Sequence, residues 1–341
     1  MAPMTGSVST ASAALRRAVY YLDRSLAPAP KVRAFRTALG VVEALGDAEL
    51  DRHLAAGTIT ELDGIGPSTG AVITEAFGSK PGYLAKLEAS TAIEAGEGAD
   101  LRARLRGDCH LHSTWSDGGA SIEEMARTAI TLGHEYIVLT DHSPRLTIAH
   151  GLSQERLDEQ RVEVERLNEL LSPFRILRGV EVDILEDGTL DHADAVLADL
   201  DIVVASVHSK LKMPAEQMTR RMVMAVANPH VDILGHCTGR QIVGTPRAPS
   251  TFDAEMVFAA CAKFGTAVEI NCRPERQDPP DELLELALDW DCMVSIDTDA
   301  HAPGQMEWQI SGCDKAVRHG IDDASIINVR SADDLLAWAA S

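Results

Sequence analysis

Residues 107–112 read GDCHLH, a short run in which two histidines are separated by a single leucine. Because side chains alternate between the two faces of a β-strand, His110 and His112 would lie on the same face. Downstream, residues 297–301 read DTDAH and repeat this spacing with Asp299 and His301. The two pairs predict short strands that carry potential metal ligands at their ends.

Seven short apolar or β-branched runs follow one another from residue 105 onward. They cover residues 107–112, 136–142, 176–184, 201–208, 231–236, 266–272 and 293–301. Helical patterns lie between them, at residues 122–132, 153–171, 215–227, 253–264 and 281–290. This alternation predicts βα units and a parallel sheet covered by helices. By itself it leaves open whether the sheet is doubly wound or closed into a barrel.

Each of the seven runs ends in or near a histidine, an aspartate or a glutamate. These polar residues are His110, His112, Asp141, His142, Glu181, His208, His236, Glu269, Asn271, Asp299 and His301. In a closed (β/α) barrel all strand carboxyl ends meet at one face, whereas an open sheet spreads them along a line. We therefore predict a barrel. A cluster of imidazoles and carboxylates without thiolates suits Zn, Mn or Fe(II), and its size implies two or three ions.

Not every histidine belongs to this cluster. Six of the twelve fall in predicted helices or loops, and for these an ordinary structural role is expected: His53, His134, His150, His192, His230 and His319. Asp141, which precedes His142, is expected to orient His142 or a neighbouring ligand.

The formal charge of −21 comes entirely from the second part of the chain. Residues 1–107 carry 12 basic and 12 acidic residues, whereas residues 108–341 carry 19 basic and 40 acidic residues. Such an excess of carboxylates argues against indiscriminate binding of nucleic acid or anionic membranes, and it suits a site that holds cations. No apolar run approaches the roughly 20 residues needed to span a membrane.

Residues 1–12 are small and polar and are expected to be frayed. They lack the basic and apolar regions of a secretory signal. The six cysteines form no CxxC pair, which indicates reduced thiols. Together these features predict a cytoplasmic protein.

Residues 13–97 carry apolar residues at helical spacing and predict a small all-α domain. Its helices are expected at residues 13–26, 32–45, 47–56 and 69–77. Gly64 and Gly66 mark a tight turn, and Pro67 suits the first position of the helix that follows. Residues 98–104 are expected to link this domain to a second one at residues 105–341.

As a set, the strand-end residues resemble a PHP (polymerase and histidinol phosphatase) domain. The resemblance covers about residues 105–335, and it is carried by CHLHSTWSDG at residues 109–118 and by the later TDH, GVE, SVH, GH and TDAH segments. It implies a distorted (β/α)7 TIM-like barrel and a metal-dependent phosphoesterase. Nine metal ligands are implied: His110, His112, Asp117, His142, Glu181, His208, His236, Asp299 and His301. The resemblance further implies that Glu181 bridges two ions.

The closer resemblance is to the PHP domain of bacterial family X DNA polymerases, through residues 184–191, 232–240 and 269–271. Residues 13–95 are similar to the helix-hairpin-helix domain of the same polymerases, but the palm, fingers and thumb are missing. The chain is therefore not expected to be a polymerase. Val72 stands near the place of the Schiff-base lysine of related repair polymerases, which gives no support for lyase activity.

Two departures from this subset concern the substrate more than the metals. Cys237 stands where the subset typically has proline, and residues 273–278 alter the loop after the sixth strand.

The turn before the last N-terminal helix is a candidate DNA contact. Backbone N–H groups at Gly64, Gly66 and Ser68 would be available to a DNA phosphate. The turn lacks flanking basic residues, so the alternative is that it only packs within its domain.

Three functions remain open. The first is a repair-linked phosphoesterase acting on DNA, as an exonuclease or a DNA-end phosphatase. The second is a small-molecule phosphomonoesterase of the histidinol-phosphatase type, and the third is a binding module with structural metals, which a set of nine ligands disfavours. Arg240 and Arg276, on predicted loops after strands, are candidates to bind the phosphate bidentately. The expected partners are a phosphoester substrate and DNA, with no membrane.

Overall fold

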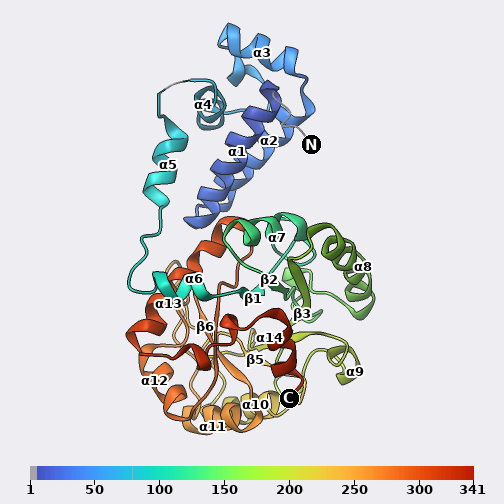
Figure 1. The fold of residues 1–341 in the computed structure, drawn as a ribbon, viewed down its shortest axis with the longest axis vertical. Helices are drawn as coiled ribbons and strands as arrows, with labels where there is room; N and C mark the ends of the chain where they lie inside the picture. Colours follow the sequence, from blue (N-terminus) through green and yellow to red (C-terminus); the bar gives the residue numbers. More distant parts are fainter. Residues whose placement is uncertain (1–5, 79) are drawn as a thin grey trace. The chain divides into compact units, whose positions relative to one another are not determined.

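The computed structural model describes residues 6–78 and 80–341, and the chain divides into two compact units between Glu94 and Ala95. The first unit is helical (Figure 1). Its elements are α1 (Ser7–Arg24), α2 (Ala29–Ala44), α3 (Asp47–Ala56), the short turn helix η1 (Ile59–Glu61), α4 (Pro67–Glu75) and α5 (Tyr83–Thr91). Its core lies where α1 packs against α2, α4 and α5, around the buried side chains of Leu15, Leu22, Phe35 and Ile73.

Three features of this part of the chain differ from the sequence-based prediction. α1 begins at Ser7, so residues 7–12 are helical rather than frayed. They are helical because Ala11 extends the buried face of the helix. Residues 1–5 lie outside the described residues. Residues 98–104 are not a linker, because they form α6 (Ala99–Arg104) within the second unit. The Gly98 N–H donates to the Asp314 carboxylate at 2.7 Å. The helical pattern had not singled out α5.

The second unit contains seven parallel strands in the order β1 to β7. They are β1 (Gly107–Leu111), β2 (Tyr136–Leu139), β3 (Arg175–Asp183), β4 (Ile202–Ser206), β5 (Ile233–Leu234), β6 (Ala267–Asn271) and β7 (Val294–Asp297). β7 returns to β1 through a parallel bridge between Leu111 and Ala300, and the His112 N–H donates to the Ala300 carbonyl at 2.8 Å. The prediction of a closed barrel is confirmed.

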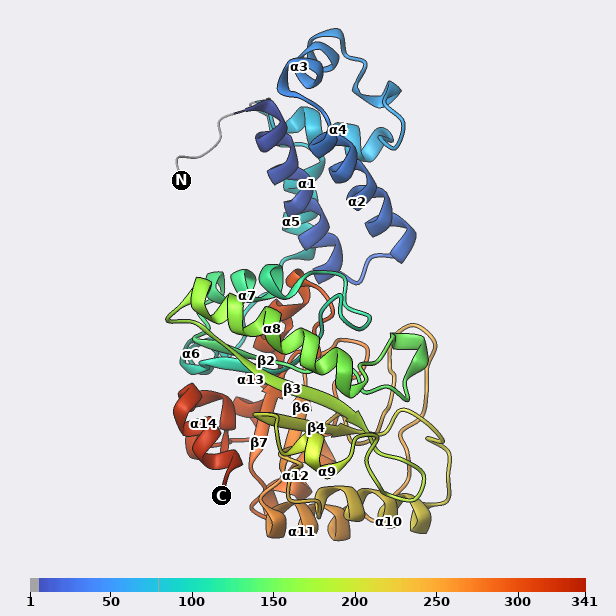
Figure 2. The same cartoon turned by 90° about the vertical axis from the view of Figure 1, so that its right-hand side faces the viewer.

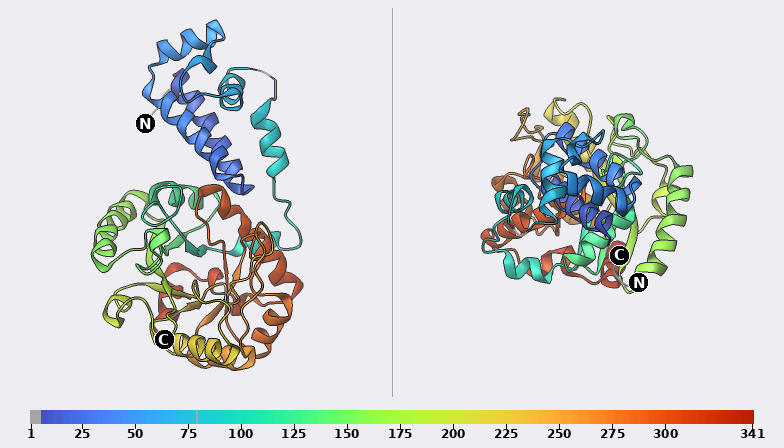
Figure 3. Two further views of the ribbon diagram at one scale, coloured as in Figure 1. Left: turned by 180° about the vertical axis from the view of Figure 1, so that it is seen from behind. Right: turned by 90° about the horizontal axis from the view of Figure 1, so that it is seen from above.

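Helices surround the strands, as the views from opposite sides in Figures 1 and 3 show. They are α7 (Ile122–Thr131), α8 (Gln154–Leu171), α9 (Asp194–Leu197), α10 (Ala215–Val226), α11 (Ala254–Phe264), α12 (Asp281–Asp289), α13 (Gln309–Arg318) and α14 (Ala332–Ala339). The strands are almost entirely buried because helices cover their outer face. In Figure 2, β3 and β4 point their carboxyl ends to the side opposite α14, and the loops that follow the strands gather there.

The seam between β1 and β7 is held by buried polar side chains. The Cys109 N–H donates to Asp297 at 2.8 Å, and the Thr298 hydroxyl donates to Asp108. Asn328 donates to the carbonyl of Ile296 at 3.1 Å and to Asp297 at 2.8 Å. These bonds complete the barrel where the backbone ladder is short, and they fix the strand ends beside the seam.

No helix among the described residues has the length and apolarity that crossing a membrane requires. All six cysteines are buried, and none forms a disulfide.

His134, in the turn between α7 and β2, is buried against α6. Its Nε2 atom accepts a hydrogen bond from Arg102 at 3.1 Å, so the neutral ring is the form that fits. Burial and, second, the charge of Arg102 lower the pKa of His134 from 6.5 to about 3. The unfolded chain then binds a proton that the folded chain does not, so stability is lost as the pH falls below about 6.5.

We predict that His134→Gln, which retains an acceptor for Arg102, weakens this pH dependence. The loss of unfolding free energy between pH 6.5 and pH 5 should be smaller by about 2 kcal/mol than in the parent. Urea unfolding at both pH values, with EDTA present, measures this difference. An unchanged pH dependence in His134→Gln would contradict the assignment.

Candidate metal centre

Glu181, near the carboxyl end of β3, lies at the centre of a ring of histidines. It is only 1% exposed, and both of its carboxylate oxygens face imidazoles. Its oxygens lie 2.9 Å from His142 Nδ1, 2.9 Å from His236 Nε2, 3.2 Å from His208 Nε2, 3.4 Å from His110 Nε2 and 3.5 Å from His112 Nε2. One buried carboxylate on β3 thus joins side chains that end or follow four other strands.

The other three predicted ligands extend the cluster towards its mouth. Asp299 Oδ1 lies 3.4 Å from His112 Nε2. Asp117 Oδ1 lies 3.3 Å from His301 Nε2 and 3.6 Å from His142 Nε2. The side chains of Asp117 and His301 are 35% and 21% exposed, whereas Asp299 is buried. The structure therefore brings all nine predicted ligands together, with Asp117 and His301 at the open side.

The donors of this cluster fit divalent cations. Three overlapping groups bring ligand atoms within 4.8 Å of one another: His112, Asp117, His142 and His301; His110, His112 and Glu181; and His142, Glu181 and His208. Several buried atoms have no hydrogen-bond partner among the described residues: His110 Nε2, both ring nitrogens of His112 and of His208, His142 Nδ1, His236 Nδ1 and Glu181 Oε2. Buried polar atoms are rarely left without partners, so their number here fits a site that binds cations. Imidazole and carboxylate donors suit Zn, Mn or Fe(II).

The electrostatics of the cluster keep its carboxylates ionised. Burial raises the pKa of Glu181, but the charges of His208 and His110 outweigh it, and the pKa lies well below its ordinary value. For Asp299, burial also raises the pKa, and Arg273 and His112 reverse the effect. Both side chains are therefore charged acceptors, as ligands of a cation must be.

Glu269, in β6, orients two of the ligands. His110 Nδ1 lies 2.6 Å from Glu269 Oε1, which leaves His110 Nε2 facing the cluster. The other carboxylate oxygen of Glu269 accepts a hydrogen bond from the backbone N–H of His236 at 2.5 Å and one from the side-chain amide of Asn271 at 3.2 Å. A carboxylate behind a histidine fixes the ring and its tautomer. The sequence placed Glu269 at a strand end but gave it no role.

Asp141 acts on a loop and not on the His142 ring. Its carboxylate accepts from the Ser113 hydroxyl at 2.7 Å, from the Ser116 hydroxyl at 2.6 Å and from Gln160 at 2.7 Å. All its hydrogen bonds with described residues go to these three side chains and to two backbone N–H groups of the same loop. Of the two expected targets, the structure supports the neighbouring ligand, because this loop carries Asp117.

The two arginines predicted to bind phosphate differ in their surroundings. Arg240 Nε donates to the Arg276 carbonyl at 2.9 Å, and its Nη2 donates to the Gln277 carbonyl. Arg240 therefore joins two loops, and its contact with a phosphate stays a prediction. Arg276 Nε lies 3.4 Å from Asp299 Oδ2, beside the cluster.

Arg273 is a site residue that the sequence patterns did not single out. Its guanidinium donates to the Asp299 carbonyl at 2.9 Å and lies over the Trp308 ring, 5.6 Å from its centroid. His301 Nδ1 approaches the same carbonyl at 2.9 Å, so Nε2 is the atom turned towards Asp117. Arg273 thus holds the segment that carries two ligands. The sequence placed Arg273 in the loop after β6, but it gave no sign that Arg273 would contact Asp299.

The predicted DNA-contact residues lie at the start of α4, in the first unit. Gly64 adopts φ +85°, a left-handed conformation that glycine tolerates, and Pro67 occupies the first turn of the helix. Gly64, Gly66 and Ser68 are exposed. The Gly66 N–H is not free as expected, because it donates to the Thr69 hydroxyl at 2.9 Å.

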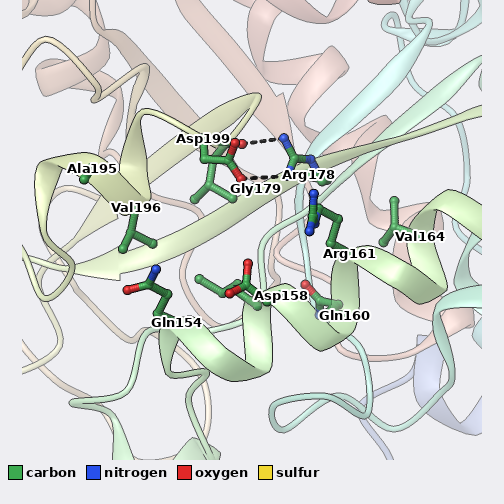
Figure 4. A pocket seen from close by; sticks show the side chains of 12 residues that line it. Gln154, Asp158, Gln160, Arg161, Val164, Arg178, Gly179, Ala195, Val196 and Asp199 are labelled. Carbon is green, nitrogen blue, oxygen red and sulfur yellow. Dashed lines mark hydrogen bonds and ion pairs between the residues drawn. The ribbon is translucent and has the colours of Figure 1, made fainter.

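A hollow lies on the outer wall of the barrel, between α8, β3 and α9 (Figure 4). It measures about 250 Å³ and exists because the crossover helix α9 is only one turn long. Arg178 and Asp199 form an ion pair at 3.1 Å across its edge. None of the predicted site residues lines it.

Comparisons with known proteins agree with this site. Residues 108–272 match a family model described as PHP domain. The DNA polymerase/3'-5' exonuclease PolX of Bacillus subtilis is 42% identical over 235 residues, which are 69% of this chain and 41% of that protein. A probable phosphatase of Thermoanaerobacter sp. is 37% identical over 170 residues, which are 48% of this chain and 63% of that protein. The chain thus spans less than two thirds of either relative.

Among solved structures, a histidinol phosphate phosphatase of Lactococcus lactis subsp. lactis, complexed with zinc, L-histidinol and phosphate, aligns with a TM-score of 0.48. It is 18% identical, and the alignment covers 64% of this chain and 95% of that chain.

We predict that Glu269→Gln weakens metal binding by about 10- to 100-fold, because His110 loses its charged partner while the shape is kept. Titration of the chelator-treated protein with Zn or Mn measures the affinity. The matched control is Glu282→Gln on the exposed side of α12, which should bind metal as the parent does. Parental affinity in Glu269→Gln would refute the role given to Glu269.

Proposed function

Residues 108–272 belong to the PHP domain family, and from this membership we propose that the chain is a metal-dependent phosphoesterase that acts on DNA, as a repair-linked exonuclease or DNA-end phosphatase. The observation that carries the proposal is the convergence of nine ligand side chains around Glu181. A site that only stabilises a fold needs about four ligands around one ion. Nine ligands with a partly exposed rim favour a reaction centre.

Two or three divalent ions, of Zn, Mn or Fe, would be held by His110, His112, Asp117, His142, Glu181, His208, His236, Asp299 and His301. Such ions supply Lewis-acid chemistry, which polarises a phosphoryl group and makes water a nucleophile at neutral pH. The protein residues supply position and charge. Asp117 and His301 face the mouth, where a phosphoester enters.

Arg276 is the residue proposed to bind the phosphate. It lies at the edge of the cluster, and a guanidinium offers two parallel donors to two phosphate oxygens. Its positive charge also offsets the negative charge that develops on the phosphoryl oxygens in the transition state. Arg273 and Asp141 are positioning residues in this scheme, because they hold the segments that carry Asp299 and Asp117.

Two observations support DNA as the substrate. The PolX relative, whose name includes a 3'-5' exonuclease, matches 69% of this chain. The first unit, in addition, exposes Gly64 and Ser68 at the start of α4, where backbone N–H groups and the helix dipole favour a phosphate. With Gly66 bonded to Thr69, the proposed phosphate contact rests on the other two residues.

The alternative is a small-molecule phosphomonoesterase of the histidinol-phosphatase type. It is favoured by the relatives that are named probable phosphatases and by the buried position of most ligands, which suits a compact substrate. The first unit would then have no part in catalysis.

We predict that removing residues 1–94 separates the two functions, because the second unit has its own core and begins at Ala95. Hydrolysis of 3′-labelled DNA should fall about tenfold or more, whereas hydrolysis of p-nitrophenyl phosphate should persist. His110→Ala combined with Asp299→Ala in the full chain is the inactive control for both substrates. Hydrolysis of the small ester alone, by the full chain, would favour the alternative. Equal DNA hydrolysis with and without residues 1–94 would refute DNA delivery by the first unit.

A further inference from the structure

Two loops beside the metal centre lack acidic residues altogether. Residues 207–214, after β4, and residues 235–252, after β5, carry two lysines and two arginines and no aspartate or glutamate. Residues 108–341 as a whole carry 40 acidic and 19 basic residues, so these loops differ in charge from the unit around them. We refer to the two segments as the basic loop pair.

The basic loop pair forms one continuous surface. The Ser250 hydroxyl donates to the Leu211 carbonyl at 2.9 Å, and the Ser250 N–H donates to the Thr238 carbonyl at 2.8 Å. Leu211 packs so closely on Gly239 that a Cβ there would lie 2.7 Å from the leucine. The two loops are therefore fixed to each other.

This surface is continuous with the mouth of the metal centre. The loops carry His208 and His236, and the Ile242 N–H donates to the Glu275 carbonyl at 2.7 Å in the loop after β6. Arg240 Nε donates to the Arg276 carbonyl at 2.9 Å, which places Arg240 next to Arg276. Arg276 in turn lies beside the cluster. Arg240 and Arg276 thus connect the loop pair to the ligand Asp299.

The exposed groups on the loop pair have two kinds of chemistry. Lys212 is exposed and forms no ion pair with any described residue, and Lys210, which is 63% exposed, has Glu186 at 4.0 Å as its acidic neighbour. Ile242 and Val243, at the tip of the second loop, are 46% and 51% exposed. Ammonium groups bind phosphates, and an exposed aliphatic surface offers apolar contact to the faces of unstacked bases.

We propose that the basic loop pair is a docking surface for a single-stranded segment of nucleic acid and directs its terminal phosphoester to the metal centre. This inference rests on the proposed action on DNA. A single strand fits better than a duplex, because most of the ligands are buried and a duplex end cannot enter a site of that depth without unpairing. The positive surface also offers local attraction in a unit whose overall charge repels polyanions.

The test is binding of a fluorescent 12-nucleotide oligothymidylate to the full chain, followed by anisotropy in EDTA so that nothing is hydrolysed. Lys210→Gln combined with Lys212→Gln should weaken binding about tenfold at 0.1 M salt. The slope of log affinity against log salt should fall by about 1.4, or about 0.7 for each phosphate that a lysine no longer neutralises. Ile242→Ser combined with Val243→Ser should weaken binding without changing this slope.

A matched control removes the same charge elsewhere. Arg220→Gln combined with Lys263→Gln changes two exposed cations on α10 and α11, and it should bind as the parent does. A general charge effect would weaken both double variants equally and would overturn the proposal. If inorganic polyphosphate of equal charge binds as tightly as the oligonucleotide, the choice of nucleic acid is overturned. If the lysine variant weakens the binding of a blunt duplex as much as that of the oligonucleotide, the choice of a single strand is overturned.

The outcomes also separate this inference from the proposed function. If the parent hydrolyses DNA and the lysine variant binds and hydrolyses it equally well, the docking surface is wrong and the nuclease stands. If the parent hydrolyses p-nitrophenyl phosphate but neither binds nor hydrolyses the oligonucleotide, the proposed action on DNA and the docking surface are both wrong. The assignment as a phosphoesterase then stands. If the parent hydrolyses neither substrate, the proposed function fails, and the anisotropy measurement still decides whether the loop pair binds a strand.

Discussion

The structure of the second unit depends on one buried carboxylate that faces five imidazoles. Glu181 and the histidines around it are withdrawn from water, and burying charged or polar groups without partners costs several kcal/mol each, on the order of 2–7. Divalent cations held by these residues would offset this cost. The long strand β3 places Glu181, and closure of β7 onto β1 brings Asp299 and His301 to it. Without closure the cluster would lie along a line.

Periodicity and position along the chain predicted the barrel and a cluster of polar strand ends, and the resemblance to PHP domains implied the full set of nine ligands. Polar residues at strand ends are visible in a pattern, and parallel strands bring those ends to one face. The partners of these residues were not predictable in the same way. Glu269 behind His110, Arg273 beside Asp299 and the loop-joining role of Arg240 depend on which side chains meet after folding. Likewise, α6 looked like a linker because six residues carry little periodicity, and its contact with α13 is tertiary.

Acidic and basic residues are unevenly distributed within the second unit. Acidic residues dominate the unit and supply three of the nine predicted ligands, whereas the loops after β4 and β5 contain no carboxylate. Cation binding and polyanion binding require opposite local charges, so this separation is compatible with the proposed binding of a nucleic acid. Arg276 lies where the two regions meet, next to Asp299. The same arrangement explains why the net charge of the chain does not by itself exclude a nucleic acid.

The number of divalent ions bound per chain tests the central claim most directly. The full chain is stripped with chelator, reloaded with Zn, Mn or Fe(II), freed of excess metal by gel filtration and measured by elemental analysis. The account predicts two or three ions per chain for the parent. Glu181→Gln, which keeps the shape but removes the shared charge, should bind at least one ion fewer. A parent that retains no metal, or a Glu181→Gln variant that retains the full number, would contradict the account.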